Sequence, residues 1–243
     1  MTTIAILSPH LDDAALSLGG TIDTLRRNGV GVKVITLFAG DLQRKGPPSS
    51  WDSKRGFHTA AETFRARRDE DLRAMQLLQA EYVWLPFVDA AYLASRDPAT
   101  VWDHLAPHLA DIDVCAVPGT PLSHPDHEYT TSLAIERVRN TIPMVFYAEY
   151  PYCTRPAHLR DFQGRLTPAS LRDRLGVELV WHDLKLTRSA ARLKREAIRC
   201  YGGEIDALGW KTSFDRFAAR LVNAERVGCG TDAALPEIFQ ELQ

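Results

Sequence analysis

The sequence predicts a single α/β domain: a Rossmann-like, mostly parallel β-sheet with helices on both faces and a C-terminal elaboration. Three observations support this class. Short apolar runs alternate with segments of helical periodicity along residues 1–150, as in repeated β-α units. The run at 30–38 is β-branched and almost continuously apolar, which is typical of a strand buried on both faces. The 243 residues, 45% of them hydrophobic, are enough for one large core.

The expected elements follow one another in the order that this class requires. Pro107 should kink or shorten the third long helix. The pair Gly19-Gly20 weakens the first helix, and we attribute it to a close approach of that helix to the sheet. Apolar runs predict strands at 4–7, 30–38, 82–85, 114–117, 144–147 and 177–181, and periodic or capped segments predict helices at 14–27, 59–79, 98–110, 128–140, 189–200 and 212–226.

Two stretches lack clear periodicity. Residues 39–58 contain glycines, paired prolines and paired serines, and predict a long loop that orders over bound substrate. Residues 155–176 are polar and irregular. We therefore expect a core with the functional site in residues 1–150, and a C-terminal part, 151–243, that wraps the sheet and lines the pocket.

Composition excludes several classes of function. The formal charge of −2 gives no basic footprint for nucleic acid, and no lysine-rich run indicates a membrane surface. The first apolar run is too short for a signal peptide, and no stretch approaches the roughly 20 apolar residues of a membrane-spanning helix. The four cysteines lack metal-ligand spacing and are expected to be buried thiols. We expect a cytoplasmic protein with a small soluble substrate, and the sequence leaves monomer and homo-oligomer open.

Two clusters of histidine and aspartate follow predicted strands. Because the carboxyl ends of parallel strands meet at one edge of a sheet, the clusters should converge although more than a hundred residues separate them. Together they predict a metal site. The first cluster holds His10, Asp12 and Asp13, and the second holds His124, Asp126 and His127.

Three of these residues form a candidate ligand set. Zinc hydrolases hold their ion with three side chains from His, Asp or Glu and leave one position for water. His10, Asp13 and His127 supply such a set. We expect one Zn²⁺ per chain, although Fe²⁺ or Co²⁺ can use the same donors.

The other three residues suggest catalytic roles. Asp12 is the carboxylate left to take a proton from water. His124 is placed to stabilise the oxyanion or to donate a proton to the departing amine. Asp126 can orient a neighbouring histidine. The alternative for Asp12 and Asp13 is a helix N-cap, and the alternative for the second cluster is a polar turn.

The segments Pro9-His10-Leu11-Asp12-Asp13 and His124-Pro125-Asp126-His127 resemble the paired motifs of the LmbE-like or PIG-L family of zinc-dependent N-deacetylases. The resemblance covers about residues 3–150. It implies a deacetylase acting on N-acetylglucosamine-type sugars, as in sugar-thiol and glycolipid-anchor biosynthesis and antibiotic tailoring. It also implies the ligand set, base and oxyanion roles given above.

The resemblance further implies two substrate contacts. Arg67-Arg68-Asp69-Glu70 resembles the family's Arg-x-x-Glu, so Arg67 would contact substrate, with Arg68 as the alternative. Asp89 resembles the carboxylate that binds sugar hydroxyls. Without the resemblance, Arg67 fits a solvated, charged helix face and Asp89 fits a turn cap.

The chain also departs from the family pattern. Leu11 and Ala14 stand where the usual His-Pro-Asp-Asp-Glu has Pro and Glu. Leu122 occupies a position where some relatives carry a tyrosine, which leaves the identity of the general acid open. Residues 146–152 resemble a stretch of relatives from antibiotic pathways.

The sequence therefore predicts a zinc-dependent hydrolase that removes an N-acetyl or N-acyl group from an aminosugar-containing small molecule or glycoconjugate, in secondary-metabolite or sugar-thiol biosynthesis. One alternative is a non-catalytic sugar-binding member, which the complete set of ligands and base disfavours. Another is a Rossmann-type nucleotide-binding or methyltransferase protein. That class expects a glycine-rich turn where this chain has Pro9-His10-Leu11.

Overall fold

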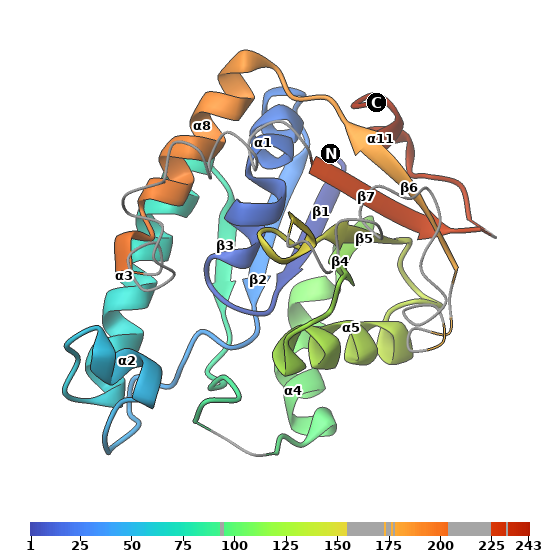
Figure 1. Cartoon of the computed structure of the whole chain (residues 1–243). Helices are drawn as coiled ribbons and strands as arrows, with labels where there is room; N and C mark the ends of the chain where they lie inside the picture. Colours follow the sequence, from blue (N-terminus) through green and yellow to red (C-terminus); the bar gives the residue numbers. More distant parts are fainter. Residues whose placement is uncertain (93–94, 155–172, 174–175, 177, 204–224, 232) are drawn as a thin grey trace.

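The computed structural model describes residues 1–92, 95–154, 173, 176, 178–203, 225–231 and 233–243. A seven-stranded sheet forms its centre, in the order β3-β2-β1-β4-β5-β7-β6 (Figure 1). The first five strands along the chain are parallel, and β7 pairs antiparallel with both β5 and β6. The strands are β1 Thr3–Ser8, β2 Gly31–Thr36, β3 Glu81–Trp84, β4 Val114–Thr120, β5 Met144–Ala148, β6 Leu179–Leu184 and β7 Glu225–Gly230.

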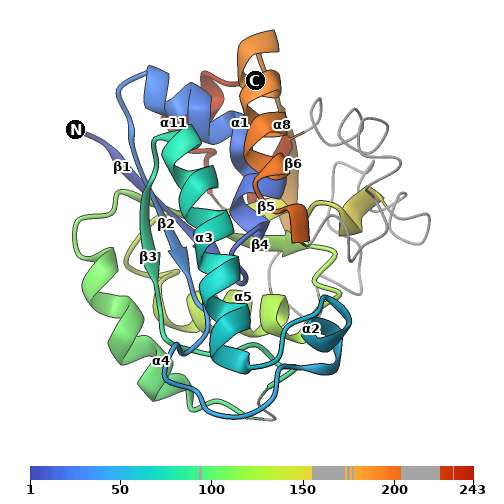
Figure 2. The same ribbon diagram turned by 90° about the vertical axis from the view of Figure 1, so that its left-hand side faces the viewer.

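Helices cover both faces of the sheet (Figures 1 and 2). Alternate residues of β1 show the two layers: Ile4 and Ile6 pack in the core beneath α1, α3 and α8, and Ala5 and Leu7 pack in the core beneath α4 and α5. No helix in the described part of the chain is both long and apolar enough to cross a lipid bilayer. The helices are α1 Asp13–Arg27, α2 Ser50–Lys54, α3 Ala60–Leu78, α4 Pro98–Leu105, α5 Pro125–Arg137, α8 Arg188–Arg199 and α11 Glu237–Gln240, with 3₁₀ turns η1 Ala106–Leu109 and η2 Tyr152–Thr154.

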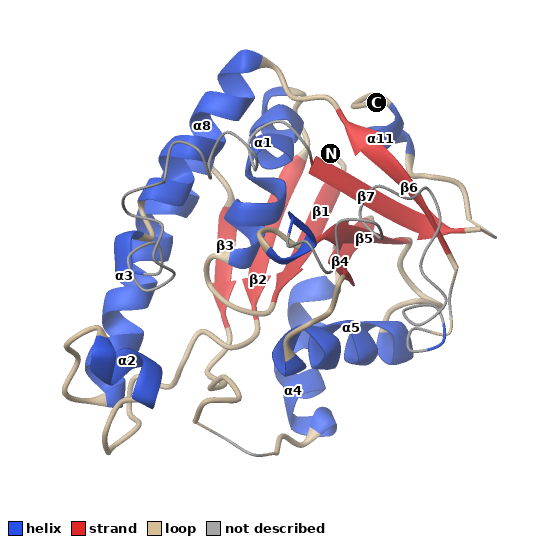
Figure 3. Ribbon diagram, in the orientation of Figure 1, coloured by secondary structure: helices blue, strands red, loops and turns tan. Residues whose placement is uncertain are grey.

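The predicted fold class is confirmed, and most elements lie where the sequence places them (Figure 3). α3 begins as the capping pattern predicts, since the Thr59 hydroxyl accepts a hydrogen bond from the Glu62 N–H at 3.1 Å. α4 ends at Leu105 and continues as the 3₁₀ turn η1 through Pro107, because proline lacks the N–H that an α-helix needs.

Two expectations about the elements need correction. The stretch 39–58 contains the short helix α2, which begins where the Ser49 hydroxyl accepts a hydrogen bond from the Asp52 N–H. The helix expected at 212–226 is wrong at its C-terminal end, because Glu225 begins strand β7; residues 212–224 lie outside the described residues, as does nearly all of 155–176. The antiparallel edge pair of β6 and β7 was not predicted.

The space left by the missing Cβ atoms of the glycine pair in α1 is filled by α8 and the segment before it, and not by the sheet as expected. A Cβ on Gly19 would lie 3.0 Å from Lys194 Cγ, and a Cβ on Gly20 would lie 2.5 Å from Leu186 Cδ1. At this crossing the fully buried Lys194 Nζ pairs with Glu225 Oε1 of β7 at 2.7 Å. The Glu225 carboxylate also accepts the Gly20 and Thr21 N–H groups at 2.8 and 2.7 Å, so it joins α1, α8 and β7.

Candidate active site

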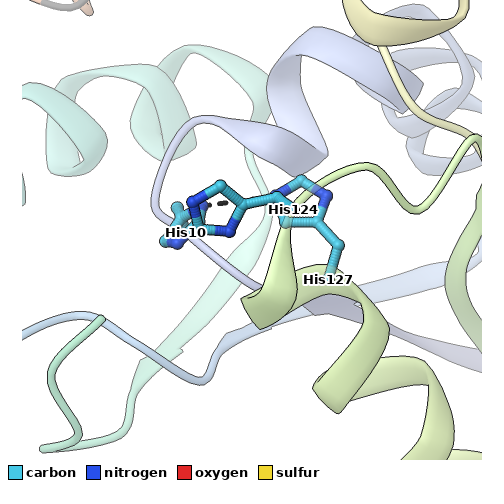
Figure 4. A group of neighbouring side chains, drawn as sticks. All are labelled: His10, His124 and His127. Carbon is cyan, nitrogen blue, oxygen red and sulfur yellow. Dashed lines mark hydrogen bonds between the residues drawn. The ribbon is translucent and has the colours of Figure 1, made fainter. Parts of the chain in front are cut away.

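The carboxyl ends of β1 and β4 bring the histidines of the two histidine-aspartate clusters together (Figure 4). His10 follows β1, His124 is the N-cap residue of α5, and His127 lies in the first turn of that helix. The His10 ring lies 4.9 Å from the His124 ring and 5.2 Å from the His127 ring, measured between centroids. The strand ends thus form one site from residues far apart in the sequence.

The turn between β1 and α1 places His10 and Asp13 side by side. The Ser8 hydroxyl donates to the His10 carbonyl at 2.5 Å and accepts the Ala14 N–H at 3.1 Å, which closes the turn. The Asp13 carboxylate, at the first position of α1, folds back and accepts the His10 N–H at 2.9 Å. The positive end of the helix dipole also favours a carboxylate there. The three-residue spacing therefore aims both side chains at one point.

Three donor atoms form a nearly equilateral triangle. Asp13 Oδ2 lies 3.4 Å from His10 Nδ1 and 3.2 Å from His127 Nε2, and the two nitrogens are 3.3 Å apart. Tetrahedral zinc with ligands at about 2.0–2.1 Å has donors about 3.3–3.4 Å apart. The triangle thus has the size and the N/O chemistry of one face of a tetrahedral metal site.

Two buried carboxylates fix the orientation of the histidines in this triangle. Asp126 Oδ2 accepts the His10 Nε2–H at 2.8 Å, and Glu149 Oε2 accepts the His127 Nδ1–H at 2.5 Å. Asp126, His127 and Glu149 are almost completely buried. Each histidine therefore keeps its other nitrogen lone pair for the centre of the triangle, as histidine ligands of metals do. Two lone pairs that face each other at 3.3 Å require a cation or a proton between them.

The charges of the site shift the pKa values of its members strongly. Burial opposes ionisation of both histidines, but Asp13 and Glu149 outweigh it and raise the pKa of His127 to about 10. Hydrogen bonds to Asp126 and Asp13 likewise raise the pKa of His10 well above its ordinary value. Against its own burial, His127 and His10 hold the pKa of Asp13 well below its usual range. Without a metal ion, protons thus occupy this centre at neutral pH.

His124 and Asp12 flank the triangle. The Asp126 N–H donates to His124 Nδ1 at 3.2 Å, so the remaining hydrogen of the neutral ring is on Nε2. Burial and the positive charge of His10 lower the pKa of His124 to about 4, which keeps the ring neutral. One ring nitrogen of His124 lies within 4.8 Å of a ring nitrogen of His10 and of His127. This upper limit is wider than the 3.2–3.4 Å edges of the triangle that includes Asp13. Asp12 is half-buried at the N-cap of α1 and lines the cavity that adjoins the donor triangle.

A cavity of about 380 Å³ extends from His10, Asp13 and His124 towards α2 and α3. On that side Arg67 Nη1 contacts Asp89 Oδ2 at 3.2 Å, and Arg67 Nη2 contacts Asp52 Oδ1 at 2.8 Å. Both Arg67 and Asp89 line the cavity, as the substrate-binding expectation requires. Asp52 is fully buried and also accepts hydrogen bonds from the Ser49 and Tyr92 hydroxyls, at 2.6 and 2.7 Å. These contacts fasten α2 and its loop to the cavity wall.

Arg68, the alternative to Arg67, has a different role. It donates hydrogen bonds to the carbonyls of Ala39 and Gly40 at 3.0 and 2.5 Å, and its guanidinium lies over the Trp84 ring at 5.3 Å. Only Arg67 of the pair lines the cavity. Leu122 is buried in the core and contributes no polar side-chain atom, while its N–H donates to Glu149 at 2.8 Å.

Three residues that matter in this geometry were not found from the sequence. Glu149 directly follows β5, so the strand-end argument that located the two clusters could have found it too. Asp52 lies in a stretch without periodicity, and its contacts depend on how that stretch folds. Arg96, from the segment between β3 and α4, lies 2.5 Å from Asp126 Oδ1, and no local pattern indicates this pairing.

Comparison with protein families gives a match over more than half of the chain. The family model described as PIG-L, GlcNAc-PI de-N-acetylase, matches residues 5–138. This range contains both histidine-aspartate clusters as well as Arg67 and Asp89. No curated protein sequence matches the chain.

Solved structures share the whole fold. A deacetylase of the teicoplanin biosynthesis pathway superposes with a TM-score of 0.75 at 21% identity, covering 96% of this chain and 100% of that one. The A40926 pseudoaglycone deacetylase gives 0.73 at 24% identity, covering 96% and 99%. The 4-carboxy-2-hydroxymuconate hydratase GalB from Pseudomonas putida KT2440 gives 0.64 at 16% identity, covering 98% and 99%. Because this fold serves deacetylases and a hydratase, the reaction must be argued from the site.

Proposed function

The chain belongs to the PIG-L family, and we propose that it is a metal-dependent hydrolase that removes an N-acetyl or other N-acyl group from an aminosugar-containing small molecule or glycoconjugate. The observation that carries this proposal is the donor triangle of His10, Asp13 and His127 with edges of 3.2–3.4 Å. The two carboxylates behind its histidines support the same assignment. A non-catalytic sugar-binding protein would need no such centre.

We assign one Zn²⁺ per chain to this triangle, with Fe²⁺ and Co²⁺ as metals that accept the same donors. The donor set fits, since two imidazole nitrogens and one carboxylate oxygen are the ligands of many catalytic zinc sites. When bound, such an ion lowers the pKa of a water molecule and polarises an amide carbonyl.

The chain's own groups supply the proton transfers. Asp12, on the cavity side of the triangle, is assigned as the base that takes a proton from the attacking water. Neutral His124 directs its Nε2–H to the developing oxyanion, which supports the oxyanion role over the acid role. Asp12 can then pass the proton that it takes from water to the leaving amine, so that one carboxylate serves both proton transfers.

The far side of the cavity is assigned to the sugar. Arg67 and Asp89 present a guanidinium and a carboxylate, which hydrogen-bond hydroxyl groups. Trp51 and Tyr152 add aromatic side chains to the cavity wall, so a sugar ring or an apolar group can pack against them. One structural neighbour is a deacetylase of the teicoplanin biosynthesis pathway, and another is the deacetylase of the antimicrobial A40926 pseudoaglycone. With their support, we propose secondary-metabolite or sugar-thiol biosynthesis for this chain.

We further propose that residues 1–150 carry the metal site and that residues 151–243 complete the pocket, supported by Pro151, Tyr152 and Tyr201 in the cavity wall. All four cysteines are free thiols, which agrees with a reducing compartment such as the cytoplasm.

The test combines metal analysis with a substrate panel. Purified protein should contain about one equivalent of divalent metal, and should release acetate and a free amine from at least one N-acetylated aminosugar, glycopeptide or sugar-thiol precursor. Chelation should abolish the release, and restoring Zn²⁺ should recover it. Full turnover by a demonstrably metal-free preparation would contradict the mechanism, and stoichiometric ligand binding without acyl release would support the sugar-binding alternative.

A further inference from the structure

We propose that Arg96 is a positioning residue of the metal centre: it holds the Asp126 carboxylate, which in turn orients His10 as a ligand. This inference rests on the proposed function, because it assumes that the triangle binds a divalent ion. Arg96 belongs to neither histidine-aspartate cluster and lies in the segment between β3 and α4.

The two oxygens of Asp126 have different partners. Oδ2 accepts the His10 Nε2–H at 2.8 Å and the Ala90 N–H at 3.0 Å. Oδ1 faces Arg96 Nη2 at 2.5 Å. The Asp126 side chain is fully buried, so the charge of its carboxylate must be compensated within the protein. Arg96 supplies a full positive charge on the side of Asp126 that points away from His10.

Arg96 is itself held in place on several sides. Its Nε and Nη2 donate to the Val88 carbonyl at 3.3 and 3.1 Å. Its guanidinium lies 4.0 Å from the centre of the Phe38 ring and 5.5 Å from that of Tyr129. Only 9% of the side chain is exposed. A planar guanidinium stacked on aromatic rings is pre-organised. The position of Asp126 is therefore set by the segment after β2, by α5 and by the β3–α4 segment together.

Removing this cation should disturb the metal site through Asp126. A buried carboxylate that loses its charge partner is strongly destabilised and must rotate or gain a proton. In either case its bond to His10 Nε2 weakens, and the Nδ1 lone pair is no longer fixed towards Asp13 and His127. Changes to groups that support metal ligands typically reduce metal affinity 10- to 100-fold.

The competing explanation is that Arg96 only fastens the β3–α4 segment to the rest of the fold. Arg68 offers a matched control for that role. It too donates to backbone carbonyls and lies over an aromatic ring, but its partners are Ala39, Gly40 and Trp84, none of which is Asp126 or a member of the donor triangle. If the effect is purely structural, replacing either arginine should change Zn²⁺ affinity to a similar extent. If Arg96 acts on the metal centre, only its replacement should lower Zn²⁺ affinity.

The experiment measures Zn²⁺ affinity by competition with a chromophoric chelator, without substrate. Arg96→Met keeps the side-chain length and removes the charge, and should bind Zn²⁺ about 10- to 100-fold more weakly than wild type. The Zn²⁺ affinity of Arg68→Met should stay within about twofold of wild type. Arg96→Lys should lose less affinity than Arg96→Met, because lysine restores the positive charge but not the planar guanidinium. Thermal unfolding of each variant shows that it is folded, and Arg96→Lys serves as the test variant if Arg96→Met does not fold.

A double-mutant cycle with Asp126→Asn identifies the route of the effect. If Arg96 acts through Asp126, Arg96→Met should weaken Zn²⁺ binding by less than about twofold in the Asp126→Asn background. Additive losses, or wild-type affinity in folded Arg96→Met, would overturn the inference. Failure of wild-type protein to bind Zn²⁺ would instead refute the proposed function, so the two failures are distinguishable.

Discussion

The two sides of the cavity are built on different principles. On the metal side, the donor atoms of His10, Asp13 and His127 face one another at 3.2–3.4 Å and need a cation to complete them. On the substrate side, Arg67 is already paired on both arms, with Asp52 and Asp89. The metal side is thus completed only when an ion binds. The polar groups of the substrate side are already held in fixed positions by their own ion pairs. Metal binding and substrate binding should therefore be separable by mutation.

Asp13→Ala should cause the largest change and act on the metal side. It removes one of three ligands, so Zn²⁺ affinity should fall by more than about 100-fold. Mutation of a residue that only hydrogen-bonds to a metal ligand already lowers metal affinity about 10- to 100-fold. Activity should disappear with the metal. Metal content by elemental analysis, measured beside initial rates, checks this. Stoichiometric metal in an active Asp13→Ala variant would contradict the assigned ligand set.

Asp12→Asn should separate the role of a base from that of a ligand, because Asp12 and Asp13 are neighbours in the same turn. Asp12 is not a corner of the donor triangle, so the variant should keep its metal and its substrate affinity. Loss of general-base help should lower kcat by roughly 10²- to 10⁴-fold. Single-turnover rates at saturating substrate separate this effect from binding. If Asp12→Asn loses the metal while Asp13→Ala retains it, the roles of the two aspartates are reversed.

The pH dependence of metal binding tests whether the triangle holds protons when it holds no ion. With the pKa of His127 raised to about 10, Zn²⁺ must displace a proton at neutral pH. Affinity should therefore increase with pH, by about tenfold per pH unit for each proton displaced, between about pH 6 and pH 8. Glu149→Gln removes one cause of the raised pKa and should lower the pH at which the affinity stops increasing. An affinity that does not change with pH would contradict the proton-filled triangle.

Arg67→Lys should have the smallest effect and act on the substrate side alone. A lysine ammonium cannot bridge two carboxylates as a guanidinium does, so Asp52 and Asp89 lose their fixed positions. We expect kcat/KM to fall about 10-fold, as for loss of one charged hydrogen bond, with Zn²⁺ affinity unchanged within about twofold. A matching loss of metal affinity would show that the two sides of the cavity are coupled.

The same contrast explains how much the sequence could predict. The order of the elements in the parallel part and the positions of both histidine-aspartate clusters follow from local patterns, because strand ends and short spacings are properties of contiguous residues. Asp52 and Arg96 could not be predicted, since each acts through a partner brought close only by the folded loops. The antiparallel strand β7 was missed because Glu225–Gly230 follows a segment with helical periodicity.

The buried pair of Lys194 and Glu225 bears on attempts to trim the protein. The family model ends at residue 138, which suggests that the N-terminal part could be produced by itself. Glu225, however, holds the N–H groups of Gly20 and Thr21 in α1, the helix that begins with Asp13. A fragment ending near residue 150 would remove the Glu225 carboxylate that α1 hydrogen-bonds. It would also expose the hydrophobic core that α8 covers. Cooperative unfolding should therefore span both ends of the chain, and the metal site should not survive truncation.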